Sequence, residues 1–456
     1  MAAKYQAPRG TRDILPEEVG LWRFLEETAR SVFSRAGYGE IRVPIFEDTD
    51  LFVRSTGADT DIVEKEMYTF AREDGASITL RPEGTPSVAR AYIEHNLYKQ
   101  IPFRKFFYLG PMFRYERPQA GRARQFHQAG IEAFGSDSPL LDVETIDLAA
   151  QYFDAIGLTG YEVRINSIGC SGCRAEFRKL LRDRLASRRS ELCENCNRRF
   201  DRNVFRILDC KEERCRGIIL TLPLVTDHLC AACAEHWREV LAGLKALGRS
   251  YVHDVHLVRG LDYYTRTVYE FVHPGLGARS AVCGGGRYDD LIAQLGGPQV
   301  GAVGFAIGFE PTIAALGERA RISASKRFDT LTTPTNVGGP VAAEPISVYL
   351  VAAGDEVRPA LLQMAQELRL AGITADLDFE GRSLKAQMRS ANRMKARYAL
   401  IVGEDELAKG TVTVRDMGTS KQEEVARDGL VERLRTDAEV PPGSSNRRGQ
   451  QPARPR

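Results

Sequence analysis

Polar and charged side chains gather in the stretch from Gly110 to Glu132, GPMFRYERPQAGRARQFHQAGIE. Its pattern predicts two strands joined by a basic turn that contains glycine. Because side chains alternate between the two faces of a strand, one face of this pair carries most of the polar groups. That face comprises Met112, Arg114 and Glu116 on the first strand, and Phe126, Gln128, Gly130 and Glu132 on the second.

An arginine, two carboxylates and an amide on one face are costly to bury, at about 1 to 3 kcal/mol for each group left without a partner. The face is therefore either a solvated hairpin surface or a ligand site. Gly130 favours the ligand site, because a glycine inside a strand lets another group approach the backbone. The turn adds Arg117, Arg122 and Arg124, whose guanidinium groups are suited to phosphates.

A second polar group lies in VHLVRGLDYYTRTVYEFV, residues 255 to 272. The ends of this stretch are typical of strands, and Gly260 predicts a turn between them. Around that turn Arg259, Asp262, Tyr263 and Tyr264 lie within six residues. The tyrosines are either core rings with satisfied hydroxyls or part of a binding site. Glu83 follows a predicted strand and precedes a helix, where an acid is also favoured by the helix dipole.

These stretches resemble one known family. FRYE at 113 to 116 and RQFHQAGIEAFG at 124 to 135 resemble motif 2 of class II aminoacyl-tRNA synthetases, in the form found in the histidyl-tRNA synthetase family. RGLDYYTRT, 259 to 267, resembles the histidine-specific signature of that family, and TLRPEGT, 79 to 85, resembles its amino-group segment. A helix and a strand with Pro44 are similar to motif 1, and VGAVGFAIGFEP, 300 to 311, to motif 3.

The resemblance implies ATP-dependent activation of L-histidine and its transfer to tRNA(His), by a homodimer, with Mg²⁺ accompanying ATP. It implies catalytic roles for Arg114 and Arg259. It implies histidine binding by Glu83, Gly84, Thr85, Arg114, Gln128, Glu132, Arg259, Tyr263 and Tyr264, and ATP binding by Arg114, Glu116, Arg122 and Phe126. Phe126 is expected to stack on adenine, and Glu116 to contact its amino edge.

One position departs from the family pattern. Pro311 follows Glu310, where the family has an arginine for the tail of ATP. This substitution favours an alternative, a catalytically inactive paralogue that serves as a regulatory subunit of ATP phosphoribosyltransferase. The intact RGLDYY turn and a complete C-terminal domain favour the synthetase instead. A third reading, an amino-acid-activating enzyme that does not use tRNA, conflicts with that same C-terminal domain.

Composition narrows the class of protein further. The chain has 456 residues, of which 43% are hydrophobic and 27% charged, which is the composition of a globular protein. Its net charge is only +2, so any binding of nucleic acid would depend on local basic patches and not on the charge of the whole molecule. The N-terminus lacks the apolar stretch of a secretory signal, and no run approaches the roughly 20 apolar residues of a membrane span. We therefore expect a cytoplasmic protein. CGGGRYDD, residues 283 to 290, is neither a Walker A loop nor a Rossmann fingerprint.

Eight of the nine cysteines lie between Cys170 and Cys233. They form the pairs Cys170/Cys173, Cys193/Cys196 and Cys230/Cys233, each spaced CxxC, and the wider pair Cys210/Cys215. In a reducing compartment this spacing indicates metal ligands, and two tetrahedral zinc sites would use all eight thiolates. Reduced, buried thiols are the alternative, and spacing does not say which pairs converge. Cys283 is expected to be a small packing residue.

The expected fold combines an α+β catalytic domain with a C-terminal α/β domain. By resemblance, residues 1–160 and 237–325 form a class II core, an antiparallel sheet of six or seven strands flanked by helices. Residues 161–236 form a cysteine-rich helical insertion, and 326–345 a linker. Residues 346–435 alternate as β, α, β, α, β, β before a final helix, which predicts a mostly parallel sheet and resembles an anticodon-binding domain. The tail, 436–456, is expected to be disordered.

Overall fold

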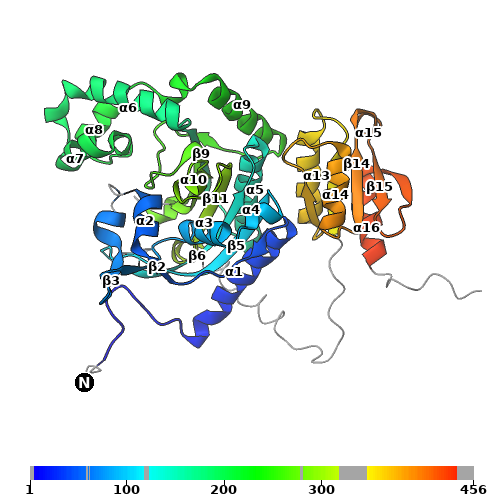
Figure 1. The fold of residues 1–456 in the computed structure, drawn as a ribbon, viewed down its shortest axis with the longest axis horizontal. Helices are drawn as coiled ribbons and strands as arrows, with labels where there is room; N and C mark the ends of the chain where they lie inside the picture. Colours follow the sequence, from blue (N-terminus) through cyan, green and yellow to red (C-terminus); the bar gives the residue numbers. More distant parts are fainter. Residues whose placement is uncertain are drawn as a thin grey trace, which may run out of the picture. The chain divides into compact units, whose positions relative to one another are not determined.

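The structure, a computed structural model, describes residues 5–57, 60, 62–117, 123–277, 281–317 and 347–438. It divides into two units, Met1–Thr333 and Pro334–Arg456. Figure 1 shows the elements of both. The expected linker, 326–345, and residues 439–456 of the expected tail lie outside the described residues. Among the described helices, none is both long and apolar enough to cross a membrane.

The first unit contains a sheet of eight strands. Its order is β1 (Gly39–Glu40), β5 (Arg104–Phe113), β6 (Gln125–Phe134), β11 (Ala302–Gly308), β10 (Ala281–Arg287), β9 (Thr265–Val272), β7 (Glu162–Ser167) and β8 (Val252–His253). The six central strands are antiparallel, whereas the short outer strands β1 and β8 pair parallel with β5 and β7. The expected antiparallel sheet is therefore correct for its centre, whereas β8 and the parallel pairing of both edge strands were not expected.

The two strands predicted around the basic turn, β5 and β6, form a hairpin next to the middle of this sheet. Their register pairs Phe113 with Gln125 and Met112 with Phe126. Helices α1 (Pro16–Arg35) and α5 (Pro139–Ile156) cover one face of the sheet (Figure 1). Phe33 of α1 lies 5.9 Å from the ring of Phe107 in β5, and 5.7 Å from that of Phe305 in β11. Aromatic packing of this kind fixes α1 against the sheet.

A smaller sheet lies beside the first, in the order β2 (Phe46–Asp48), β4 (Ser77–Leu80) and β3 (Tyr68–Ala71). In the chain, β2 is followed by α2 (Thr49–Thr56), and the π-helical turn Ile62–Glu66 then leads into β3. Strand β4 is followed by α3 (Thr85–Glu94). The remaining short helices are α4 (Leu97–Gln100), α10 (Leu291–Gln294) and α11 (Phe309–Ala315). The single strand expected around Pro44 is broken into β1 and β2, because proline cannot donate a ladder hydrogen bond.

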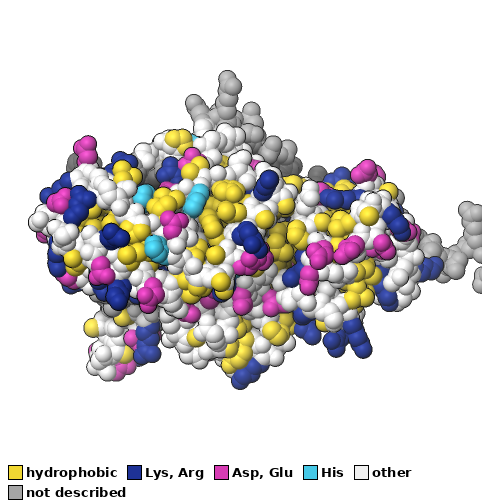
Figure 2. Space-filling view, turned by 90° about the horizontal axis from the view of Figure 1, so that it is seen from above, with side chains coloured by type: hydrophobic (Ala, Val, Ile, Leu, Met, Phe, Trp, Pro, Cys, Tyr) yellow, Lys and Arg dark blue, Asp and Glu magenta, His cyan; other side chains and the backbone are white. Residues whose placement is uncertain are grey.

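The insertion is helical, as expected. It contains α6 (Ser171–Ala186), α7 (Glu194–Arg202), the 3₁₀ turn Val204–Ile207, α8 (Glu213–Ile219) and α9 (Ala231–Ala246). Its expected range, 161–236, takes in β7, which the structure places in the large sheet against β9. The same range cuts α9, which packs on α5. On the face that Figure 2 shows, basic and acidic side chains lie intermixed, as on a solvated surface.

The second unit is an α/β domain with five strands. In chain order it contains β12 (Ser347–Ala352), α13 (Arg358–Leu370), β13 (Thr374–Leu377), α14 (Leu384–Arg393), β14 (Tyr398–Val402), α15 (Glu404–Lys409), β15 (Thr411–Asp416), β16 (Gln422–Ala426) and α16 (Leu430–Ala438). The sheet order is β13-β12-β14-β15-β16.

Two predictions for this second unit need correction. The sheet is mixed rather than mostly parallel, because β12 pairs parallel with β13 and β14 while β15 pairs antiparallel with β14 and β16. Helix α15 was missed, because it is only six residues long and lies directly between β14 and β15. Helix α16 extends to Ala438, beyond the expected end of the domain at residue 435.

Candidate active site

The polar face predicted on β5 and β6 borders the segment TLRPEGT. Arg114 follows β5 directly, and its Nε donates a hydrogen bond of 2.9 Å to the carbonyl oxygen of Pro82. The Arg114 guanidinium also lies 5.2 Å from the centroid of the Phe126 ring. These contacts place an arginine and an aromatic ring side by side. The arginine also contacts Pro82, which directly precedes Glu83 in the chain.

Glu83 lies where three separate segments meet. Its side chain is 5% exposed. Thr56, at the end of α2, donates to Glu83 Oε1 at 3.2 Å, and Tyr263 donates to Oε2 at 2.8 Å. Burial raises the pKa of Glu83, and the hydrogen bond from Tyr263 and the charge of Arg114 oppose that rise. The carboxylate is therefore poised to accept a further cationic partner.

A second buried carboxylate, Glu132, lies on β6. Thr85 donates to Glu132 Oε1 at 2.6 Å, and the hydroxyl of Tyr288 donates to Oε2. Burial raises the pKa of Glu132 well above its usual value, and repulsion from Glu83 adds to the shift. Two buried acids that repel each other mark a place for a positively charged ligand.

Aromatic rings enclose the space beside these acids. The ring of Tyr263 lies 4.7 Å from that of Tyr264 and 5.4 Å from that of Tyr288. Burial raises the pKa of Tyr264 to about 12, so its hydroxyl stays protonated. Nearby on β6, Gln128 Oε1 is buried and has no hydrogen-bond partner among the described residues. The walls thus offer hydroxyl donors and one unused acceptor.

Tyr108 closes the space between β6 and the start of α3. A Cβ atom on Gly130 would lie 2.3 Å from Tyr108 Cζ, and one on Gly84 would lie 2.4 Å from it. Real Cβ atoms do not approach a ring so closely, so both positions need glycine. The prediction that Gly130 allows a close approach is confirmed, and the group that approaches is a side chain of this same chain.

Arg259 lies at the start of the turn that carries the tyrosines. Its Nη1 pairs with Glu270 of β9, and its guanidinium lies 5.8 Å from the centroid of the Tyr264 ring. Burial acts to lower the pKa of Arg259, but the charge of Glu270 raises it, so the guanidinium stays charged. Its Nε is buried without a hydrogen-bond partner among the described residues, which leaves a donor for a ligand.

Of the residues expected to bind ATP, Arg114, Glu116 and Phe126 lie at one end of the hairpin. Glu116 follows β5 in the loop after Arg114, and Arg122 lies outside the described residues. Glu310 accepts a hydrogen bond of 2.9 Å from the backbone N–H of His127. Pro311 occupies the third position of α11, which begins at Phe309.

Sequence reasoning missed the residues that support the turn from Arg259 to Tyr264. We call this turn the histidine turn, after the histidine-specific signature that it resembles. Arg174 Nη1 donates to the carbonyl oxygens of Asp262 at 3.0 Å and Tyr264 at 2.8 Å. Arg206 Nη1 donates to the carbonyl oxygen of Gly260 at 2.9 Å, and Asn203 donates to the Asp262 side chain. All three donors belong to the insertion. Thr56, Tyr108 and Tyr288 were missed as well, since no local pattern links them to the site.

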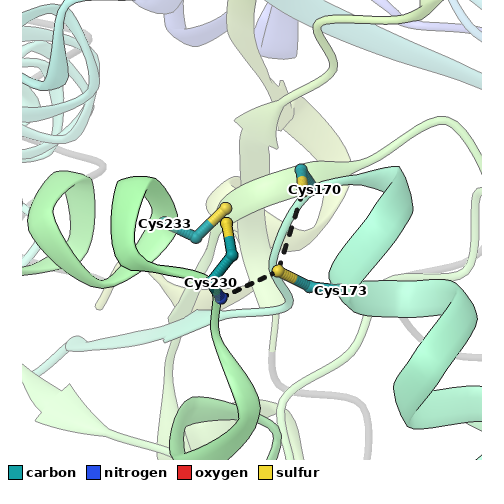
Figure 3. Close-up of side chains that lie close together, drawn as sticks. All are labelled: Cys170, Cys173, Cys230 and Cys233. Carbon is teal, nitrogen blue, oxygen red and sulfur yellow. Dashed lines mark hydrogen bonds between the residues drawn. The ribbon is translucent and has the colours of Figure 1, made fainter.

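The structure also decides how the cysteines pair. Cys170 and Cys173 converge with Cys230 and Cys233, and Cys193 and Cys196 converge with Cys210 and Cys215. Within each cluster the sulfur atoms all lie within 4.8 Å of one another. Figure 3 shows the first cluster, with the four side chains directed toward one another. Cys283 is buried in β10 and belongs to neither cluster, as its expected packing role requires.

An antiparallel sheet with this hairpin, its arginine and aromatic pair, and a separate α/β domain defines a class II aminoacyl-tRNA synthetase. The sequence model described as "Histidyl-tRNA synthetase" matches residues 10–311, and that described as "Anticodon binding domain" matches residues 347–437. The chain belongs to the histidyl-tRNA synthetase family.

Similar proteins extend this assignment over nearly the whole chain. "Histidine--tRNA ligase" of Moorella thermoacetica is 50% identical over 94% of this chain and 97% of its own. The protein of the same name from Thermotoga petrophila is 46% identical over 94% and 97%. A crystal structure of apo Staphylococcus aureus histidyl-tRNA synthetase has a TM-score of 0.57 and 35% identity, and covers 94% of this chain and 99% of its own.

A structure described as an ATP phosphoribosyltransferase regulatory subunit/histidyl-tRNA synthetase, from Bacillus halodurans C, has a TM-score of 0.54. It covers 88% of this chain and 99% of its own, at 19% identity, so it shows the shared fold alone. The regulatory alternative therefore has less support than the synthetase.

Proposed function

We propose that this protein activates L-histidine with ATP to form histidyl-adenylate, and transfers the histidyl group to tRNA(His). The observation that carries the proposal is the contact between RGLDYY and TLRPEGT, in which Tyr263 donates to the buried Glu83. That contact brings together two segments far apart in the chain, next to the buried acids Glu83 and Glu132. Relatives that share about half of their residues with this chain are named for the same activity.

The acids and tyrosines suit histidine as a ligand. Glu83 would bind the α-ammonium group, with Thr85 and the backbone of Gly84 beside it. Gln128, Glu132 and Tyr264 would face the imidazole, and the unused Gln128 Oε1 would accept its N–H. A pocket that hydrogen-bonds both ring nitrogens can reject analogues that lack them by factors of about 10⁴ or more.

The arginines suit the chemistry of adenylate formation. The histidine carboxylate attacks the α-phosphorus of ATP, the bond to the β-phosphate oxygen breaks, and pyrophosphate leaves. Negative charge builds on the phosphoryl oxygens, and Arg114 and Arg259 would stabilise it from fixed positions. Arg259 can contribute its unpartnered Nε without losing its pairing with Glu270.

ATP would lie at the Phe126 end of the hairpin, with adenine on the Phe126 ring and its amino edge at Glu116. Arg122 would reach the phosphates from the turn. Magnesium would neutralise charge on the triphosphate, whose oxygens and water supply most of its ligands. Glu310, a partly buried carboxylate beside His127 of β6, fits the one or two acidic ligands that such an ion takes.

Two features suit tRNA as the second substrate. A groove of about 660 Å³ lies between the segment 60–66 and α7, and its lining includes Arg198, Arg199, Arg202 and Arg206. In the second unit, Lys385, Arg389, Arg393 and Lys395 are exposed along and just after α14. Arginine and lysine side chains in such rows bind phosphates of nucleic acids. We expect the protein to be a homodimer and to work in the cytoplasm, where tRNA is charged. Measuring its molecular mass in solution tests the dimer.

The test is histidine-dependent exchange of pyrophosphate into ATP, followed by charging of tRNA(His). We expect exchange with histidine and not with the other amino acids, and charging when tRNA is added. Tyr263→Phe removes the hydrogen bond to Glu83 and should raise the KM for histidine by roughly tenfold. This variant shows that the activity belongs to this chain, because a contaminating host enzyme would be unaffected.

The regulatory alternative makes the opposite prediction. No exchange with any amino acid, together with stimulation of ATP phosphoribosyltransferase, would replace the synthetase assignment with that of a regulatory subunit. Exchange without charging would indicate an enzyme that activates histidine for an acceptor other than tRNA.

A further inference from the structure

We propose that each cysteine cluster binds one zinc ion as four thiolates, and that the two ions fix the insertion residues that position the histidine turn. The part that concerns the turn rests on the proposed function, whereas the metal sites stand on their own geometry. Both clusters lie in the insertion, outside the pocket described above.

The distances between sulfur atoms fit a tetrahedral ion. Zinc–sulfur bonds of about 2.3 Å at the tetrahedral angle separate the sulfur atoms by about 3.8 Å. The Sγ atoms of Cys170 and Cys173 are 3.6 Å apart, and those of Cys193 and Cys210 are 3.8 Å apart. A disulfide needs about 2.05 Å, so neither pair is a disulfide. Four sulfur atoms around one point at this spacing are the arrangement that zinc prefers.

Backbone donors are directed at the same sulfur atoms. The N–H of Cys230 donates to Cys173 Sγ at 3.1 Å, so it joins the two CxxC pairs of the first cluster. In the second cluster the N–H of Cys193 donates to Cys215 Sγ at 3.2 Å, and that of Cys196 donates to Cys193 Sγ at 3.3 Å. A thiolate accepts such bonds far better than a neutral thiol, because charge strengthens the acceptor. The donors therefore favour metal-bound thiolates over a set of reduced thiols.

Each cluster is directly connected to the turn that carries the tyrosines. Arg174 follows Cys173 of the first cluster, and it donates to the carbonyl oxygens of Asp262 and Tyr264. Asn203 and Arg206 lie in the loop that Cys196 and Cys210 of the second cluster close, and they donate to Asp262 and Gly260. The three donors are positioning residues, since they contact the backbone of the turn and the side chain of Asp262.

Buried residues of the insertion, among them Phe177 and Leu181, belong to the same hydrophobic cluster as Tyr108 and Val268 of the large sheet. The strands of that sheet are nevertheless held together by interactions that do not involve the ions. The central strands are paired across the sheet by backbone ladders from β5 to β7, and α1 and α5 cover one face. Metal loss should therefore loosen the insertion and displace the turn while the sheet stays folded.

The first measurement is elemental analysis of the full chain, purified without chelators. We expect about two zinc ions per chain. Cys170→Ser with Cys230→Ser should leave about one, and Cys196→Ser with Cys210→Ser should also leave about one. Cys283→Ala, which removes the buried cysteine outside both clusters, should keep two. Iron in place of zinc, or zinc-free protein, would overturn the metal assignment, and this readout does not depend on any enzymatic activity.

A second measurement uses the wild-type protein, so it remains valid if the cysteine variants fail to fold. Wild-type protein reconstituted with cobalt(II) should show the visible absorption of tetrahedral thiolate coordination, with intensity for two sites. Absence of that absorption in folded, metal-loaded protein would contradict four-thiolate sites.

The third measurement tests the link to the turn. Arg174→Ala should keep two zinc ions and raise the KM for histidine in the exchange reaction by roughly tenfold, with Arg174→Lys recovering part of the loss. Arg238→Ala, a matched change of an exposed arginine of α9 that forms an ion pair with Glu235, should leave both unchanged. An unaltered KM for Arg174→Ala would show that the clusters do not position the turn.

Discussion

Tyr263 donates a hydrogen bond of 2.8 Å to Glu83 although 180 residues separate them in the chain. Tyr263 comes from the turn before β9, and Glu83 lies between β4 and α3. Burial of the pair gives the hydrogen bond its strength, because water does not compete for either group. The pocket is therefore assembled by the fold, and each side chain depends on the other's position.

The first prediction concerns the cost of burying Glu132. Its pKa is raised in the folded protein, so the folded state loses stability relative to the unfolded chain as pH rises through that raised value. Glu132→Gln removes the charge, and its amide can still hydrogen-bond the hydroxyls of Thr85 and Tyr288. We expect the variant to be more stable at pH 8 by about 1 to 3 kcal/mol, with a flatter pH profile.

Urea unfolding of both proteins between about pH 5 and 8 measures this difference. If Glu132→Gln is less stable at every pH, the carboxylate is a net stabilising group and the charge argument fails.

The second prediction concerns Arg259. Arg259→Ala should lower kcat for exchange by about 10² to 10³ and change the KM for histidine little, because the guanidinium acts on charge that develops in the transition state. Steady-state exchange at varied histidine and ATP separates the two parameters. A variant that loses histidine affinity and keeps turnover would assign Arg259 to ground-state binding instead.

The third prediction concerns Pro311. Pro311→Arg supplies the charge that the family pattern has at this position, and one charge-assisted contact with phosphate contributes about 1.5 to 3 kcal/mol. The KM for ATP should fall by roughly tenfold to a hundredfold, with the choice of amino acid unchanged. Since Pro311 lies in the first turn of α11, an arginine there does not break the helix.

Pro311→Gln controls for the loss of proline without adding charge, and should leave the KM for ATP unaltered. Equal ATP kinetics for wild type and Pro311→Arg would indicate that another cation already contacts the phosphates. Arg122→Ala, made both in the wild type and in Pro311→Arg, then tests whether Arg122 is the cation that contacts the phosphates.

The fourth prediction concerns the contact between Gly130 and Tyr108. Gly130→Ala places a methyl group 2.3 Å from Tyr108 Cζ, so the buried ring, which is also in close contact with Gly84, would have to shift. We expect a loss of about 1 to 3 kcal/mol in unfolding free energy. Thermal or urea unfolding measures it. In a Tyr108→Leu background the same change should cost markedly less, and an equal cost in both backgrounds would locate the strain elsewhere.

Local patterns in the chain were sufficient for the hairpin of β5 and β6, for the turn before β9 and for the helical insertion. The first strand of the hairpin ends at Phe113, so Arg114 and Glu116 follow the strand on which they were predicted, and the strand expected from Val255 is absent. Alternation with a period of two determines which side chains of β6 share a face, so Gln128 and Glu132 could be placed together without any tertiary information. The resemblance to the family added the chemistry of these residues and the order of the domains. It also drew attention to Pro311, whose effect depends on what the family has at that position.

Only the tertiary structure decided which cysteine pairs converge, and that Arg174, Asn203 and Arg206 support the histidine turn. Spacing of two residues makes CxxC pairs equivalent in sequence, and which pairs meet depends on how α6 to α9 fold back on themselves. Tyr288 likewise donates to Glu132, which is 156 residues away in the chain. Thr56 donates to Glu83, which is 27 residues away. Contacts at such separations depend on strand order and helix packing, which periodicity along the chain does not encode.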